Sequence, residues 1–257
     1  MTDSSTPPII CHTANAVTHI RIARPEKKNA ITREMYQLMA DGINAASADP
    51  AVRSVLLYGE PAVFTAGNDL EDFLKAPPAG LDSPVFRFMQ ALTHCPKPVV
   101  VAVNGPAVGI GTTLLLHADL VYAADNALLS MPFVTLGLCA EFASSLLVPA
   151  LCGTAKASEK LLLGESMSAE EARDLGFITA VMAPQDVLPH AIRKAEKFNT
   201  LPPEGVQATK KLMRASSHSA VDAVIAAEAE HFARLLRTPH FKEAVSAFFE
   251  KRKPSFV

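Results

Sequence analysis

The chain has 257 residues, of which 49% are hydrophobic and 19% charged, with a formal net charge of -2 at pH 7. These values are typical of a soluble globular protein with one domain, or one domain and an appendage. The chain lacks the excess of basic residues that is typical of a nucleic-acid-binding protein. No apolar run approaches the roughly 18 residues that a membrane helix needs.

Strands and helices alternate in the first half of the chain. Residues 16–24 alternate in polarity as a half-buried strand does, and residues 32–47 have apolar side chains at helical spacing behind the possible N-cap Thr32. Residues 53–59 and 97–105 are short, β-branched and almost continuously apolar, which is typical of strands covered on both faces. A glycine-containing turn and a helical segment follow each of them, which predicts an α/β fold.

The second half of the chain becomes helical. Residues 119–132 indicate two short strands around an Asp-Asn turn, and residues 177–182 indicate one more strand. The predicted helices cover residues 154–165, 168–176, 185–200 and 203–216, and a long final stretch from Ser219. The Pro- and Gly-rich loop 76–84 is long enough to be a mobile lid. We therefore predict an α/β core followed by a helical carboxyl-terminal third.

The cysteines and the amino-terminal residues favour a reducing compartment. The four cysteines form no CxxC pair and have no metal-ligand spacing with histidine, so free thiols are expected, with no structural metal. The segment MTDSSTPPII has no basic stretch followed by an apolar core, so no secretory signal is predicted. We expect a cytoplasmic protein.

Two glycine turns stand at the carboxyl ends of buried strands, where ligands collect in open α/β sheets. They are FTAGNDL, residues 64–70, and NGPAVGIG, residues 104–111. Neither has the spacing of a phosphate loop or of a dinucleotide fingerprint. Each can expose backbone N–H groups, at Ala66 and near Gly109 to Gly111, and two such groups aimed at one point form an oxyanion hole. Taken singly, each turn is more often a plain chain reversal.

The combination resembles the enoyl-CoA hydratase/isomerase (crotonase) superfamily. FTAGNDL is followed by PVVVAVNGPAVGIGTTLLLHADLVYA, and the resemblance continues through GTAKASEKLLLGESMSAEEARDLGFITAV and the terminal FFEKRKPSF. It implies a crotonase-like spiral of ββα repeats, with a core at residues 1–200 and a helical oligomerisation region at residues 201–257. A homotrimer or a dimer of trimers is implied. Lys251 and Lys253 would then complete a neighbour's coenzyme A site, or else form an ordinary solvated helix end.

The resemblance also assigns site residues. It implies an oxyanion hole for the thioester oxygen of an acyl-CoA, made by the N–H groups of Ala66 and Ile110. The implied contacts with the acyl-CoA are Lys27, Lys28, Ala30, Ala66, Gly67, Asn68, Asp69, Leu70, Gly109 and Phe133. Without the resemblance, Lys27 and Lys28 would be an ordinary solvated turn. For Asp69 we favour a role as N-cap of the helix that follows. Coenzyme A enters as part of the substrate, and no other cofactor and no metal is implied.

Glu141 is the only acidic or basic residue between Asp125 and Lys156. The two glutamates of the hydratases would fall on Thr113 and Phe133, so both are missing. PFVTLGLCAEFASSLLVP resembles the Δ3,Δ2-enoyl-CoA isomerases of the peroxisomal type, in which the glutamate of this pattern is the single catalytic base. The resemblance therefore implies that Glu141 is the base.

The sequence around Glu141 predicts an apolar setting. The expected neighbours are Phe133, Leu136, Leu138, Phe142 and Leu146. Burial among them would raise the pKa of the carboxyl group and make it a stronger base for a carbon acid. The alternative is a first-turn glutamate of the following helix, exposed or paired with an arginine. Phe142 departs from the glycine that is familiar in the family and would reshape the acyl pocket.

Three functions stay open. The first is isomerisation of 3-enoyl-CoA to trans-2-enoyl-CoA, in fatty acid β-oxidation. The second is an atypical enoyl-CoA hydratase or another enzyme of thioester enolates, and the third is a catalytically silent coenzyme A-binding relative. A serine hydrolase is unsupported because the chain has no GxSxG motif. His117 and Asp119 are interpreted as structural residues.

Overall fold

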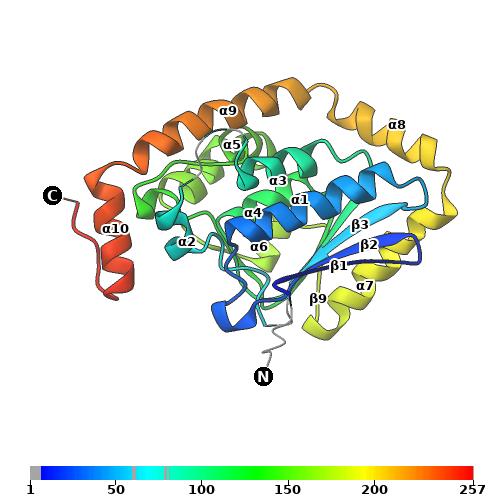
Figure 1. Ribbon diagram of the computed structural model, residues 1–257, viewed down its shortest axis with the longest axis horizontal. Coiled ribbons are helices and arrows are strands. Elements are labelled where there is room, and N and C mark those ends of the chain that lie inside the picture. Colours follow the sequence, from blue (N-terminus) through cyan, green and yellow to red (C-terminus); the bar gives the residue numbers. More distant parts are fainter. Residues whose placement is uncertain (1–6, 60–61, 78–79, 81, 257) are drawn as a thin grey trace.

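The computed structural model describes residues 7–59, 62–77, 80 and 82–256, and it confirms the α/β fold (Figure 1). A six-stranded sheet has the order β1-β2-β3-β4-β6-β9, and a three-stranded sheet has the order β5-β7-β8. In the large sheet β1 runs antiparallel to β2, and the remaining pairs are parallel. The strands are β1 (Ile9–Ala14), β2 (Val17–Ile22), β3 (Ser54–Tyr58), β4 (Val99–Val103), β5 (Ala107–Val108), β6 (Leu120–Ala124), β7 (Leu128–Ser130), β8 (Met167–Ser168) and β9 (Ala180–Met182).

The helices follow the strands in strand-strand-helix units. They are α1 (Arg33–Ala48), α2 (Leu70–Lys75), α3 (Pro84–Thr93), α4 (Ile110–Thr113), α5 (Ser144–Leu162), α6 (Ala169–Asp174), α7 (Pro184–Lys197), α8 (Pro203–Arg214), α9 (His218–Leu235) and α10 (Pro239–Phe249). In the β4-β5-α4 and β6-β7-α5 units, the first strand joins the large sheet and the second joins the small one. The predicted spiral of ββα repeats is therefore present.

Both faces of the large sheet are covered, which explains the continuous apolar runs of its strands. Along β3, Val55 and Leu57 belong to the main core with α1 and α3, whereas Leu56 packs with Val187 and Ala191 of α7. Helices α1 and α7 accordingly lie on opposite sides of the sheet (Figure 1). Side chains that alternate along one strand thus enter two separate apolar layers.

Several predicted elements are confirmed and others are corrected. Thr32 caps α1, because its hydroxyl accepts the Met35 N–H at 3.3 Å. The two strands predicted around the Asp-Asn turn exist as β6 and β7, but they pair in different sheets. Strand β1 was not predicted. The helix predicted from residue 154 is the second part of α5, which begins at Ser144 and is kinked at Gly153.

Helices α8, α9 and α10 form an arm that runs over the top of the molecule and down its left side in Figure 1. The predicted final helix is two helices, α9 and α10, and Thr238 caps the second by accepting the Phe241 N–H. Phe232 and Phe241 from this arm belong to the main core. Within the residues that the structure describes, no helix combines the length and apolar character needed to cross a membrane. The predicted lid at residues 76–84 lies partly outside the described residues.

Candidate active site

The two glycine turns are joined by backbone contacts. Thr65 and Ala107 form a parallel bridge, and the Val108 N–H donates to the Thr65 carbonyl at 3.0 Å. A Cβ atom on Gly67, which has φ 86°, would lie 2.7 Å from the Val108 carbonyl oxygen. A Cβ on Gly111 would lie 2.4 Å from Thr65 Cγ2. Both glycines are therefore needed for the close approach of the turns.

The backbone hydrogen bonds of these turns correct the predicted oxyanion hole. The Ala66 N–H donates to the Lys28 carbonyl at 3.0 Å, so it is not a free donor. The N–H groups of Asn68 and Ile110 have no hydrogen-bond acceptor among the described residues. Asn68 is fixed by its side chain, because the Tyr36 hydroxyl donates to its Oδ1 at 2.6 Å. The free N–H of this turn is therefore that of Asn68, two residues after the predicted donor Ala66.

A cavity of about 560 Å³ opens in front of the two turns. All ten predicted contact residues line it: Lys27, Lys28, Ala30, Ala66, Gly67, Asn68, Asp69, Leu70, Gly109 and Phe133. Helix α10 of the same chain contributes Phe241, Phe248 and Phe249 to its wall. The carboxyl-terminal helix therefore completes the cavity of its own chain, and neither Lys251 nor Lys253 lines it.

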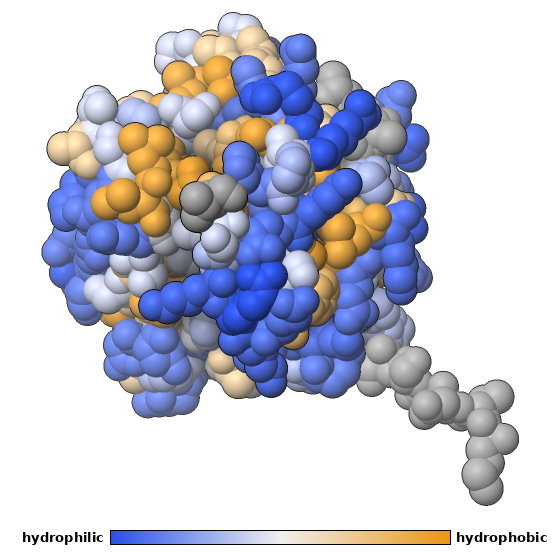
Figure 2. Space-filling view, turned by 90° about the vertical axis from the view of Figure 1, so that its left-hand side faces the viewer, coloured by the Kyte–Doolittle hydropathy of each residue, from blue (hydrophilic) through white to orange (hydrophobic). Residues whose placement is uncertain are grey.

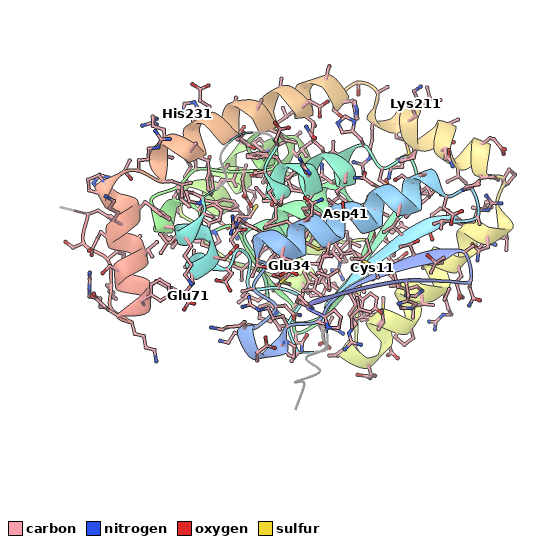
Figure 3. The ribbon with its side chains drawn as sticks, viewed as in Figure 1. Cys11, Glu34, Asp41, Glu71, Lys211 and His231 are labelled. Carbon is pink, nitrogen blue, oxygen red and sulfur yellow. The ribbon has the colours of Figure 1, made fainter. Side chains whose placement is uncertain are left out.

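The rim of this cavity carries charged side chains. Lys27 and Lys28 are exposed, in a short turn that ends with Lys28 in a left-handed conformation. Glu71 of α2, labelled in Figure 3, also lines the cavity. Hydrophobic side chains reach the surface on the side of the molecule where α10 lies (Figure 2), and Phe248 is 60% exposed there. The cavity mouth thus combines an apolar surface with the ammonium groups of Lys27 and Lys28 and the carboxylates of Glu26 and Glu71.

Asp69 has the predicted structural role and a further one. Its Oδ1 accepts the Asp72 N–H at 3.1 Å and so caps α2. Its Oδ2 accepts Arg24 Nη1 at 2.6 Å, and the same guanidinium donates to the Ala30 carbonyl. Although burial opposes the shift, the bond from Arg24 lowers the pKa of Asp69. Asp69 therefore fastens α2 to the turn that holds Lys27 and Lys28.

Glu141 stands at the start of a constrained turn. Phe142 and Ala143 both have positive φ, 57° and 56°, where non-glycine residues are uncommon. His117 stacks on the Phe142 ring with centroids 3.9 Å apart, and its Nε2 donates to the Phe142 carbonyl at 2.9 Å. Burial lowers the pKa of His117 to about 4, so this imidazole is neutral. His117 is thus structural, as predicted, and it explains how phenylalanine is held where the family has glycine.

A distant glutamate holds the other side of the same turn. Glu228 of α9 accepts the Ala143 N–H at 2.6 Å and the N–H and hydroxyl of Ser145 at 3.0 and 2.6 Å. Ser144 donates its hydroxyl to the Glu141 carbonyl at 2.6 Å. These bonds satisfy the amino-terminal N–H groups of α5. Sequence reasoning missed Glu228, because no local pattern links it to residues 141–145.

The Glu141 side chain is buried and unpaired. It is 7% exposed, and neither its Oε1 nor Thr113 Oγ1 has a hydrogen-bond partner among the described residues. Burial, and next the negative charge of Glu228, raise the pKa of Glu141 to about 8, while the nearby Thr113 hydroxyl opposes this shift. Helix α5 begins three residues later, so Glu141 is not an exposed first-turn glutamate. The raised pKa that burial predicted is confirmed.

The apolar surroundings of Glu141 differ from those predicted. The carboxyl group borders a small cavity of about 20 Å³, whose other walls come from α2, α3 and α9 and from Phe142. Of the five predicted neighbours only Phe142 lines this space, whereas Phe133, Leu136 and Leu138 line the larger cavity. Phe73 and Phe232 line both cavities and pack edge to face with centroids 6.0 Å apart. This pair separates Glu141 from the cavity in front of the glycine turns.

A second group of polar side chains lies away from both cavities. His94 contacts Asp222 through Nε2 at 3.1 Å and His218 through Nδ1 at 3.0 Å, which joins the end of α3 to the start of α9. No role was predicted for His94 or His218. Their hydrogen bonds to one another and to Asp222 account for their positions.

The chain matches the Enoyl-CoA hydratase/isomerase family over residues 12–257. A 1,2-epoxyphenylacetyl-CoA isomerase of Escherichia coli (strain K12) is 33% identical over 97% of this chain and 98% of its own length. Enoyl-CoA delta isomerase 2 of Homo sapiens is 34% identical over 86% of this chain, which spans 57% of that protein. The solved structure of OdaA from Pseudomonas aeruginosa is 49% identical, with a TM-score of 0.93 over 95% of this chain and 99% of that one. Relatives named as hydratases match at similar identity.

Proposed function

The chain belongs to the enoyl-CoA hydratase/isomerase family, and we propose that within it the protein is an acyl-CoA double-bond isomerase that converts 3-enoyl-CoA to trans-2-enoyl-CoA. The observation that carries the proposal is a buried carboxyl group, Glu141, whose Oε1 has no hydrogen-bond partner among the described residues and whose pKa is raised to about 8. A base with a pKa near the working pH is well matched to removing a proton from carbon.

The reaction needs one base and one site for negative charge. Glu141 removes a proton from C2 of the acyl group, and the electrons move onto the thioester oxygen to form an enolate. The free N–H groups of Asn68 and Ile110 stabilise that oxygen, each with an effect of about 3 kcal/mol by analogy with other oxyanion holes. Glu141 then returns the proton to C4, which leaves the double bond between C2 and C3. The scheme transfers one proton and requires no metal or redox cofactor.

The residues near Glu141 argue against hydration. Adding water in the usual arrangement needs a second carboxylate to orient the water molecule, and the two hydratase positions hold Thr113 and Phe133. Glu228 does not replace it, because both of its oxygens accept hydrogen bonds from the turn at residues 143–145. The cavity beside Glu141 is lined by apolar side chains apart from the two glutamates. These features favour an isomerase over an atypical hydratase.

The remaining interactions follow from the same site. Lys27 and Lys28 bind the phosphates of coenzyme A at the rim of the 560 Å³ cavity, and the acyl group points toward Glu141.

Self-association into a homotrimer or a dimer of trimers is supported by exposed apolar side chains on α5 and α8, among them Leu162, Leu212 and Met213. A cytoplasmic location fits the four free cysteines.

One alternative substrate is favoured by a specific observation. Six phenylalanines line the large cavity: Phe73, Phe133, Phe232, Phe241, Phe248 and Phe249. Aromatic walls suit a ring-bearing acyl group as well as a linear one. The relative named 1,2-epoxyphenylacetyl-CoA isomerase matches almost the whole chain. Ring isomerisation through a thioester enolate is therefore the second candidate, with the same base.

The test compares substrates and variants in one assay. Purified protein is incubated with 3-enoyl-CoA, with trans-2-enoyl-CoA and with an epoxidised phenylacetyl-CoA, and products are identified by absorbance and mass spectrometry. We expect the 3-enoyl substrate to gain a conjugated thioester, and Glu141→Gln to lower kcat by at least about a hundredfold. Glu230→Gln, which changes an exposed carboxylate of α9, is the matched control and should act like wild type.

Each other outcome identifies a different function. Water addition to the trans-2-enoyl substrate would support the hydratase alternative, and turnover of the ring substrate alone would support the second candidate. Acyl-CoA binding without turnover of any substrate would indicate a silent relative. If Glu141→Gln is as active as wild type, Glu141 is not the base.

A further inference from the structure

Three cavities meet at Phe232 of α9. The first is the 560 Å³ cavity in front of the glycine turns, the second is the 20 Å³ space beside Glu141, and the third is a cavity of about 210 Å³. Phe86 and Ala229 line the second and third cavities, and Phe232 lines all three. The side chain of Phe232 therefore borders each of them.

The sequence of α9 explains the third cavity. Ala226, Ala229, Glu230 and Ala233 line it and occur at positions i, i+3, i+4 and i+7, which share one face of a helix. Glu230 is exposed, and the three methyl side chains leave a shallow groove beside it. Phe232 adjoins this face, is 8% exposed, and is held by Phe73 through the edge-to-face contact. The Phe232 ring thus stands between this groove and the other two cavities.

The space beside Glu141 and the third cavity would together fit a linear apolar chain. A space of 20 Å³ holds about one water molecule, so the atoms of an acyl chain beside Glu141 have little room in this arrangement. The acyl carbons that react must nevertheless reach Glu141, and the remaining carbons of a long chain would have to continue past it. Apart from the exposed Glu230, the alanine groove with Phe86 offers them an apolar wall, and burying methylene groups there is favourable. The Phe232 ring stands across that route.

We propose that Phe232 sets the acyl chain length, so that the natural substrate is a CoA thioester with a short acyl chain that ends beside Glu141. The 210 Å³ cavity is the extension that a smaller residue at position 232 would connect to the base. This inference rests on the proposed function, since it names the substrate class of the same site.

The test measures chain-length preference in two ways. One readout is kcat/KM for 3-enoyl-CoA thioesters with six-carbon and ten-carbon chains. The other is the Kd of the saturated six-carbon and ten-carbon acyl-CoA compounds by calorimetry, which needs no turnover. We expect wild type to favour the six-carbon chain, and Phe232→Ala to shift the ten-to-six ratio of both constants toward the longer chain by at least about tenfold. Phe232→Leu, which keeps more of the core packing, should shift it by a smaller factor.

Two control variants separate this effect from general damage. His231→Ala alters the neighbouring exposed residue of α9, and Lys211→Ala alters an exposed residue of α8 that lines none of the three cavities (Figure 3). Both should leave the ten-to-six ratio unchanged. Equal preference of wild type for both lengths, or an unchanged ratio in both Phe232 variants, would overturn the inference. Absence of isomerisation together with the expected shift in Kd would overturn the proposed function alone, and absence of any acyl-CoA binding would overturn both.

Discussion

The turns that face the large cavity and the turn that carries Glu141 are neighbours, but they are held in different ways. The first are fixed by backbone bonds between separate segments, such as Thr65 with Ala107, 42 positions apart, and by glycines where the chains touch. The second has two non-glycine residues at positive φ and is fixed by His117 and Glu228, 25 and 85 positions away in sequence. The comparison shows that both sites are assembled from distant segments, but glycines mark the first in the sequence, whereas the second is held by side chains that no local pattern reveals.

The largest expected effect concerns the cost of burying Glu141. Its pKa in the folded protein is about 8, against an ordinary value of 4.5 for a solvated glutamate. Between these values the folded state binds more protons than the unfolded state, so this group makes stability fall as pH rises from 4.5 through 8. We expect the free energy of unfolding of Glu141→Gln, minus that of wild type, to increase by about 3 kcal/mol from pH 5 to pH 9. Urea unfolding of both proteins across this range measures the difference.

Glu228 is present in both proteins, so its contribution cancels when the free energy of unfolding of one is subtracted from that of the other. A constant difference from pH 5 to pH 9 would mean that Glu141 is solvated in solution. In that case the contrast between the two turns would disappear.

The second prediction removes the distant support of the Glu141 turn. Glu228→Gln takes away a negative charge and places an amide N–H₂ where one carboxylate oxygen accepted a backbone N–H. We expect kcat to fall about tenfold because the turn relaxes and the base is misplaced. The rising limb of kcat/KM should also move to lower pH, since loss of the Glu228 charge lowers the pKa of Glu141 and the base acts when deprotonated.

The pH profile of 3-enoyl-CoA isomerisation distinguishes this role from a general loss of stability, which would lower the rate at every pH without moving the limb. Glu230→Gln is the control on the same helix, with an exposed carboxylate. An unshifted profile in Glu228→Gln would show that the distant glutamate does not tune the base.

The smallest expected effect tests the region of the glycine turns. Asp69→Ala removes the cap of α2 and the ion pair with Arg24, and we expect the free energy of unfolding to fall by about 1 kcal/mol. Asp69→Asn keeps a capping oxygen and should lose less. Thermal or urea unfolding measures both variants. Equal losses would indicate that the ion pair, and not the cap, fastens α2.

Much of the fold follows from sequence patterns. The β-branched run of β4 and the helical spacing behind Thr32 predict elements close to those observed, because strand and helix periods are set by neighbouring residues. The break between α9 and α10 was missed, although Thr238 followed by Pro239 is a helix-start signal. Strand β1 was missed although it pairs with the adjacent β2, whereas β5 and β8 were missed because they have two residues each and exist through pairing with β7.

The sequence by itself determined the family, the two glycine turns, ten of the residues that line the large cavity, and the isolation of Glu141 from other charges along the chain. Only the tertiary structure decided that the free N–H belongs to Asn68 and not to Ala66, that Glu228 stands beside Glu141, and that Phe232 divides the cavities. The physical reason is the distance along the sequence over which each property is set. Turn geometry depends on adjacent dihedral angles, whereas burial and electrostatic fields sum over side chains that the fold brings together from distant positions.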